Sequence, residues 1–353
     1  METGLIMSGS KIFLLLFSLF LFSCTERENS ETTLQFQDGK FRIVQFTDIH
    51  FQYDSYRSDS ALVLMRKVIE SEKPDLVMLT GDIVCSKNTR NAWLKLTDVL
   101  VDAGVPWGVT FGNHDPEYEL TKEEIIETIE GLPNNLTVNG PSEIAGNGNY
   151  ILEIKSEGSD MTAALLYCFD SHSSFEPETD LGTYEWIEFS QIAWYREQSR
   201  KYSTLNGGKP LPSLAFFHIP LPEYNEIAGR EGTIGIYEES VCCPDLNSGM
   251  YTSMLECGDV MGMFTGHDHD NNFIGSLRKI CMAYGYASGR QSYGSIGRGA
   301  RVIDLYEGKR HFDTYVIKMY ECDRDKDIWQ PAEERSPQFF VTFRDSVLTE
   351  ASH

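Results

Sequence analysis

The chain has 353 residues, of which 53 are acidic and 30 basic, so its formal net charge is −23. Hydrophobic residues make up 41% and aromatic residues 12%, which is enough for an ordinary core and argues against disorder over most of the chain. The acidic balance repels polyphosphate backbones at long range, so tight binding to bulk DNA or RNA through a basic surface is disfavoured. Eight cysteines in a chain of this length are not a disulfide scaffold.

The N-terminal segment has the proportions of a secretory signal peptide. Residues 12–22 are apolar except for Ser18, follow Lys11, and give way at once to a polar run. This stretch is too short to span a bilayer core, which needs roughly 20 residues, but a short apolar run behind a cation is typical of an export signal. The ending Leu21-Phe22-Ser23-Cys24 resembles a bacterial lipobox, whose cysteine becomes the lipidated first residue.

We therefore expect residues 1–23 to be a signal peptide, Cys24 to be the lipid attachment site and residues 24–39 to be a polar linker. The protein would be exported to the cell envelope and held at the membrane through this lipid anchor only. An ordinary signal peptide or a buried helix is the alternative.

Of the eight cysteines, Cys24 lies in this segment and seven remain, an odd number that cannot all pair internally. No C-x-x-C pair is present, so a thiolate zinc site is not expected. We expect the vicinal Cys242 and Cys243 to be unpaired or differently paired thiols, with a strained disulfide between them as the alternative.

From Phe41 onward, short β-rich runs alternate with amphipathic stretches, as in stacked α and β layers. Thr121 with Glu124 predicts a capping box at a helix start, and residues 325–353 are polar and irregular. The predicted strands are 41–47, 75–80, 105–111, 150–155, 161–169, 213–217, 259–265 and 300–305. The predicted helices are 60–72, 91–103, 121–130 and 186–202, and the long loops, which could face a substrate, are 132–148, 171–183 and 221–248.

Five short polar clusters each follow one of the predicted strands. Carboxylates and imidazoles at the ends of buried strands are where α/β sheets place their sites. Five of the eight histidines fall within these clusters. The clusters are Asp48-Ile49-His50, Gly81-Asp82, Gly112-Asn113-His114-Asp115, His218 and Gly266-His267-Asp268-His269.

This mixture of side chains suits a pair of metal ions. Such a pair needs a bridging carboxylate, several neutral imidazoles and an oxygen donor, with positions left open for water and substrate. Aspartate and histidine together suit iron, manganese or zinc, whereas calcium takes nearly all oxygens. Asp48 and His50, two apart on an extended segment, face the same way. The glycines before Asp82, Asn113 and His267 permit tight turns and a close backbone approach.

The ordered motifs D-x-H, G-D, G-N-H-D, H and G-H-x-H, spread over residues 41–320, resemble those of the calcineurin-like metallophosphoesterase superfamily. The segments 216–224 (FFHIPLPEY), 266–271 (GHDHDN) and 297–302 (GRGARV) resemble the branch with plant purple-acid-phosphatase-like proteins and fungal cell-cycle phosphatases. The resemblance implies an α/β fold, a four-layer αββα sandwich of two mixed sheets flanked by helices. We expect this domain to span residues 40–322, followed by a C-terminal extension over 323–353.

The resemblance also implies the roles of the clustered residues in hydrolysis of a phosphate monoester by a hydroxide that bridges two divalent or trivalent metal ions. His114 would be the general acid and Asp115 would orient its imidazole. The implied ligands are Asp48, His50 and His269 for one ion and Asn113, His218 and His267 for the other, with Asp82 bridging the two.

Two positions depart from the purple acid phosphatases. Those enzymes have tyrosine where this chain has Cys85, and glycine where it has His50. A charge-transfer tyrosinate is therefore not expected, and the protein should be colourless. We expect Cys85 to be an inert core residue rather than a reactive group.

The expected partner is a small phosphorylated substrate, and no nucleic acid. Candidates for substrate contacts are His172, Arg290 and Arg298, for which a solvated surface position is the alternative. Two other functions stay open: a phosphodiesterase acting on a nucleotide or a lipid head group, and a catalytically inactive surface binding protein.

Overall fold

The computed structural model describes residues 1–2, 32–323 and 328–351, and divides the chain into two units, Met1–Glu31 and Thr32–His353. The predicted signal peptide from residue 3 onward and the predicted lipidation site Cys24 lie outside the described residues. No helix within the described ranges combines the length and the hydropathy that a membrane crossing requires.

Two mixed sheets of seven strands each form the centre of the second unit. In the first sheet the strand order is β16-β15-β14-β13-β2-β3-β4, and in the second it is β1-β5-β6-β9-β10-β12-β11. The strands of the first sheet are β2 (Lys40–Phe46), β3 (Leu76–Thr80), β4 (Trp107–Thr110), β13 (Arg298–Tyr306), β14 (His311–Asp323), β15 (Ile328–Arg344) and β16 (Val347–Glu350). Those of the second are β1 (Leu34–Gln35), β5 (Tyr150–Lys155), β6 (Thr162–Cys168), β9 (Ser213–Phe216), β10 (Val260–Thr265), β11 (Ile274–Leu277) and β12 (Ile280–Tyr284), and β7 (Ser174–Thr179) and β8 (Gly182–Tyr184) form a separate hairpin.

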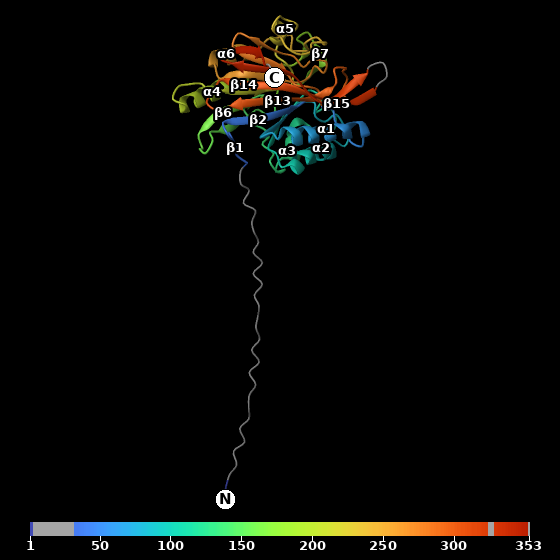
Figure 1. Cartoon of the computed structure of the whole chain (residues 1–353), viewed down its shortest axis with the longest axis vertical. Helices are drawn as coiled ribbons and strands as arrows, with labels where there is room; N and C mark the ends of the chain where they lie inside the picture. The colour runs from blue at the N-terminus through green and yellow to red at the C-terminus, as the bar shows by residue number, and fades with distance from the viewer. Residues whose placement is uncertain (3–31, 324–327, 352–353) are drawn as a thin grey trace. The chain divides into compact units, whose positions relative to one another are not determined.

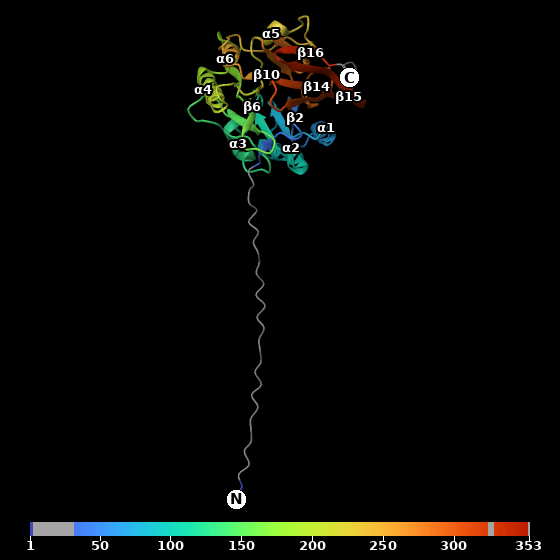
Figure 2. The same cartoon turned by 60° about the vertical axis from the view of Figure 1, so that its left-hand side comes forward.

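Helices cover the outer faces of both sheets, as Figures 1 and 2 show. The helices α1 (Tyr56–Glu72), α2 (Thr89–Ala103) and α3 (Lys122–Ile129) pack on the first sheet through one apolar core. The helices α4 (Phe189–Leu205), α5 (Tyr224–Ile227) and α6 (Met250–Cys257) pack on the second sheet through another core. The expected four-layer αββα sandwich is confirmed.

Strand β3 shows why the sequence forms these layers. Its residues are all buried and apolar except for Thr80 at its end. Leu76 and Met78 point into the core between the two sheets, while Val77 and Leu79 point into the core beneath α1 to α3. Successive side chains of a strand face opposite ways, so a strand with helices on one side and a sheet on the other is apolar throughout.

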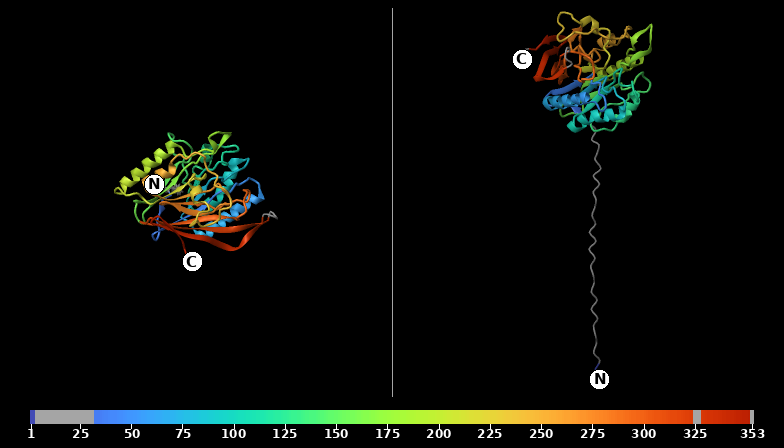
Figure 3. Two further views of the ribbon diagram at one scale, coloured as in Figure 1. Left: turned by 90° about the horizontal axis from the view of Figure 1, so that it is seen from above. Right: turned by 90° about the vertical axis from the view of Figure 1, so that its right-hand side faces the viewer.

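Several predicted boundaries differ from the structure because strand pairing, which the sequence pattern does not show, decides them. Residues 34–36, expected in the linker, join the second sheet through β1, and Phe36 is buried. The segment after Asp323, expected to be irregular, contains β15 and β16, which extend the first sheet beyond β14. Figure 3 shows these orange and red strands side by side. The expected loop at 171–183 contains β7, whereas the capping box of Thr121 and Glu124 is present as predicted.

Candidate metal centre

All five polar clusters follow strands at one end of the two sheets. Strands β2, β3 and β4 are parallel neighbours, so the residues after them, including Asp48 and Asp82, meet at the same edge. Strands β9 and β10 are parallel neighbours in the other sheet, and His218 and His267 follow them. The backbone N–H of His267 donates to the Asp48 carboxylate at 3.1 Å, which joins the two sheets at the site.

The backbone here adopts conformations that non-glycine residues rarely take. Asp48, His50, Asp82 and His267 have positive φ values of 52°, 47°, 53° and 83°. Residues held in such regions cluster at functional sites, because the surrounding structure must compensate for the strain. Gly112 is required for a different reason: a Cβ atom there would lie 2.1 Å from Oδ1 of Asp82.

Asp48, His50, Asp82 and His269 form the first group of potential ligands, with one ligand atom of each within 4.8 Å of the others. Nε2 of His50 lies 3.3 Å from Nε2 of His269, and the latter lies 3.2 Å from Oδ1 of Asp48. Nε2 of His50 also lies 3.5 Å from Oδ2 of Asp82. Two imidazole nitrogens and two carboxylates thus face one point.

Asp82 also belongs to the second group, with His218 and His267. Asn113 lines the same cavity as His267. Nε2 of His218 lies 3.2 Å from Oδ2 of Asp82. Within the part of the chain that the structure describes, Oδ1 of Asn113 and Nε2 of His267 are buried without a hydrogen-bond partner. Buried polar atoms are normally satisfied, so these two orphaned atoms beside a buried carboxylate fit a bound cation. These residues therefore fit a second metal ion that shares Asp82 with the first.

The outer nitrogens of three imidazoles are already engaged, which leaves Nε2 directed toward the centre. Nδ1 of His218 lies 2.8 Å from the carbonyl of Thr80, and Nδ1 of His269 lies 3.1 Å from the carbonyl of Tyr293. Nδ1 of His50 lies 3.2 Å from Sγ of Cys85. A proton on Nδ1 fixes the tautomer that offers Nε2 as a ligand, as is usual for metal-binding histidines. Cys85 is therefore in contact with the site through His50.

Burial keeps two of the imidazoles neutral. Burial lowers the pKa of His50 to about 3 and, with the neighbouring His218, lowers the pKa of His267 to about 3. His218 differs: burial opposes its protonation, but the carboxylates of Asp82 and Asp48 outweigh this and raise its pKa to about 9. Protonated His218 therefore places a positive charge beside the two aspartates.

His114 lies at the mouth of the site, and its orienting partner is not the one expected. Its Nδ1 lies 2.6 Å from Oε1 of Glu117, and its Nε2 lies 3.9 Å from Oδ2 of Asp82. The prediction that Asp115 orients His114 is wrong, because the Asp115 carboxylate accepts the backbone N–H groups of Asp82, Ile83, Val84 and Gly112. Glu117, three residues after His114, carried no motif that singled it out.

A cavity of about 240 Å³ opens onto these residues. Its lining residues are His50, Asp82, Asn113, His114, Tyr184, Cys242, His267, Asp268, His269, Gln291, Ser292 and Tyr293. Five of these residues carry no recognisable motif in the sequence and were not predicted: Tyr184 at the end of β8, and Cys242, Gln291, Ser292 and Tyr293 on loops.

None of the three predicted substrate contacts lines this cavity. Arg298 is fully buried, and its guanidinium donates to the carbonyls of Gly289, Ser292 and Tyr293, so its assignment to substrate binding is wrong. Nε2 of His172 lies 2.7 Å from Oε1 of Gln191. Arg290 lies on the same loop as Tyr293.

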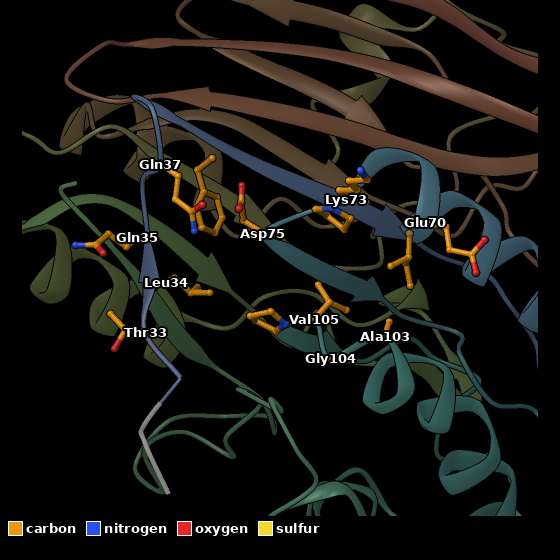
Figure 4. Close-up of a pocket in the computed structure, with 14 residues that line it drawn as sticks. Thr33, Leu34, Gln35, Gln37, Glu70, Lys73, Asp75, Ala103, Gly104 and Val105 are labelled. Carbon is orange, nitrogen blue, oxygen red and sulfur yellow. The ribbon is translucent and has the colours of Figure 1, made fainter. Parts of the chain in front are cut away.

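A second cavity, of about 560 Å³, lies at the opposite ends of β3 and β4, where Figure 4 shows Lys73, Asp75 and Val105. Among its described lining residues there is no histidine or cysteine. The vicinal Cys242 and Cys243 are free thiols, as expected.

The comparisons with known proteins agree with this geometry. Residues 41–271 match the family described as calcineurin-like phosphoesterase. The chain is similar to "Probable inactive purple acid phosphatase 29" of Arabidopsis thaliana, with 32% identity over 75% of this chain and 77% of that protein. It is also similar to "Phosphatase DCR2" of Saccharomyces cerevisiae, with 31% identity over 76% of this chain and 52% of that protein. A dimetal phosphatase from Danio rerio shares the fold, with a TM-score of 0.52 and 13% identity over 78% of this chain and 95% of that one.

Proposed function

The chain belongs to the calcineurin-like phosphoesterase family, and from this premise and the site geometry we propose that it hydrolyses phosphate monoesters at a centre of two metal ions. The observation that carries the proposal is the position of Asp82. Its carboxylate belongs to both groups of potential ligands, and in the second group Nε2 of His218 lies 3.2 Å from it while Nε2 of His267 is buried without a hydrogen-bond partner. A shared carboxylate between two such groups is what a dinuclear centre requires.

Each ligand group would hold one ion. Asp48, His50 and His269 would bind one, Asn113, His218 and His267 the other, and Asp82 both. Bound iron, manganese or zinc ions would lower the pKa of water and neutralise charge on the phosphoryl oxygens. Aspartate and histidine suit all three metals.

We propose that His114 donates a proton to the departing alcohol. Burial opposes its protonation, but the charges of Asp82 and Glu117 outweigh this and raise its pKa, which favours the protonated imidazole. Glu117 is hydrogen-bonded to Nδ1 of His114, so Nε2 lies on the side of Asp82. General acids in such positions contribute on the order of 10² to 10⁴ to the rate.

The test is hydrolysis of p-nitrophenyl phosphate after reconstitution of the full chain with manganese, zinc or iron. We expect hydrolysis of p-nitrophenyl phosphate that requires metal. His114→Ala should keep its metal while losing turnover on an alkyl phosphate, whose leaving group needs the proton. A variant that hydrolysed the alkyl phosphate as fast as wild type would contradict the role of His114.

Two alternatives have their own outcomes in the same assay. Faster hydrolysis of bis(p-nitrophenyl) phosphate than of the monoester would favour a phosphodiesterase acting on a nucleotide or a lipid head group. Metal binding without turnover on either ester would favour an inactive binding protein, an alternative raised by the word "inactive" in the name of the Arabidopsis relative.

We also propose that the protein is exported and anchored through a lipid on Cys24, with the phosphoesterase domain joined to that anchor by the polar segment after it. The support is the lipobox-like ending of the apolar N-terminal stretch. Metabolic labelling with palmitate should mark the wild-type protein and not Cys24→Ser. Equal labelling of both would contradict the anchor.

A further inference from the structure

Two tyrosines flank the cavity beside the candidate ligands. The ring of Tyr293 stacks on the imidazole of His269, with centroids 4.0 Å apart and an interplanar angle of 27°. The ring of Tyr184, at the end of β8, meets His267 edge to face, with centroids 4.7 Å apart. Both line the same cavity as His114. The alcohol part of a bound phosphate ester would therefore lie against aromatic surface.

Two carboxyl groups lie near this aromatic surface: one is bonded to Tyr293, and the other lines the cavity. The hydroxyl of Tyr293 donates to Glu239, whose other oxygen accepts the backbone N–H of Asp270 at 3.1 Å. Asp268 lines the cavity and accepts the hydroxyl of Tyr284 at 2.6 Å. Asp268 therefore adds a carboxyl group to the cavity that Tyr184 and Tyr293 line.

Among the described residues that line the cavity, none is a Lys or Arg that could balance these carboxyl groups. Arg298, the first residue of β13, donates its guanidinium N–H groups to backbone carbonyls of the loop that carries Tyr293. Two metal ions would neutralise the phosphate, but a second anionic group on the substrate would meet Asp268, with no Lys or Arg among the described lining residues.

We infer that the preferred substrates are small phosphate monoesters of alcohols that carry an ammonium group, with Tyr184 and Tyr293 forming the subsite for that cation and Glu239 bonded to the hydroxyl of Tyr293 outside the cavity lining. This inference rests on the proposed function. Aromatic faces backed by a carboxylate recognise quaternary and primary ammonium groups. The cavity of about 240 Å³ is smaller than the roughly 300 to 1,000 Å³ of sites for drug-sized ligands, which agrees with a small substrate.

Three test substrates of similar size distinguish the effect of charge on hydrolysis from the effect of shape. Phosphocholine carries the cation, 3,3-dimethylbutyl phosphate is its uncharged isostere, and 3-phosphoglycerate carries a second anion. A cation–π contact is worth about 0.5 to 2 kcal/mol, so we expect kcat/KM for phosphocholine to exceed that for the isostere by roughly 2-fold to 30-fold. The value for 3-phosphoglycerate should be the lowest of the three.

Substitutions at the subsite should reduce this ratio. Tyr293→Leu and Glu239→Gln should each bring phosphocholine and its isostere closer together. The matched control is Tyr306→Leu, because Tyr306 also stacks on a histidine, His311, and bonds to a carboxylate, but does not line the cavity. It should leave the ratio unchanged.

The outcomes distinguish this inference from the proposed function. Failure to hydrolyse p-nitrophenyl phosphate with any metal would overturn the proposed function. Hydrolysis of p-nitrophenyl phosphate with equal kcat/KM for phosphocholine and the isostere, or with preference for 3-phosphoglycerate, would overturn the cation subsite alone. An equal loss of the ratio in Tyr293→Leu and Tyr306→Leu would also overturn it.

Discussion

Replacing Asp115 with asparagine should destabilise the protein, because this carboxylate holds two loops of the site together rather than orienting His114. Its Oδ1 accepts the backbone N–H groups of Ile83 and Val84 at 2.8 and 3.1 Å. Its Oδ2 accepts those of Asp82 and Gly112 at 3.0 and 2.8 Å. The residue is fully buried, so water cannot replace the carboxylate.

The size of the effect follows from what asparagine can still accept. Its carbonyl can serve one pair of N–H donors, but its amide nitrogen would face the other pair as a donor against donors. Leaving a buried polar group unsatisfied costs about 1 to 3 kcal/mol, so two such groups predict a loss of about 2 to 6 kcal/mol of unfolding free energy. Domains are typically stable by about 5 to 15 kcal/mol, so this loss is a large fraction of the total.

The assay is urea unfolding of Asp115→Asn and wild type in excess chelator, so that bound metal does not add to stability. Burial and the charge of Asp82 raise the pKa of Asp115, so the comparison is made at about pH 8, where the wild-type carboxyl is ionised. We expect a lower midpoint with an unchanged slope. An unchanged midpoint, together with a turnover loss confined to poor leaving groups, would refute this reasoning and restore Asp115 as the partner of His114.

Three further predictions concern the site. Glu117→Gln should keep its metal but hydrolyse an alkyl phosphate roughly tenfold more slowly. The loss on p-nitrophenyl phosphate should be smaller, because its leaving group needs no proton from His114. Equal losses on both esters would contradict this prediction. Because the pKa of His218 is raised to about 9, metal binding at about pH 7 should release one proton from this imidazole. Calorimetry in buffers of different ionisation enthalpy measures the release. A release that disappears only above about pH 9 would support this prediction, and no release at pH 7 would contradict it. Gly112→Ala would place a Cβ 2.1 Å from Oδ1 of Asp82, so metal analysis should show loss of bound metal, and a full complement would show that the site can relax.

The sequence predicted the strands that carry the site because their chemistry is local. Apolar runs buried on both faces, such as residues 76–79, end in polar clusters that have no role in a core, and this pattern places the aspartates and histidines at strand ends. The glycine before Asn113 was also informative, because the space beside Asp82 leaves no room for a side chain.

What the sequence did not predict depends on contacts between distant segments. The direction in which the Asp115 carboxylate turns is set by backbone N–H groups from the loop after β3, and no spacing rule shows this. Arg298 reads as a substrate contact in a glycine-rich segment, but the fold encloses it among loop carbonyls. Strand β15 was missed because its pairing with β14, rather than its own pattern, makes it a strand.

We propose that two metal ions share Asp82, and metal analysis of purified wild type and Asp82→Ala is the sharpest test of this proposal. Wild type should hold about two transition-metal ions per chain, and Asp82→Ala should lose both the metal and the hydrolysis of p-nitrophenyl phosphate. A wild-type protein that hydrolysed the ester with no transition metal bound, or an Asp82→Ala variant that retained two ions, would contradict the claim.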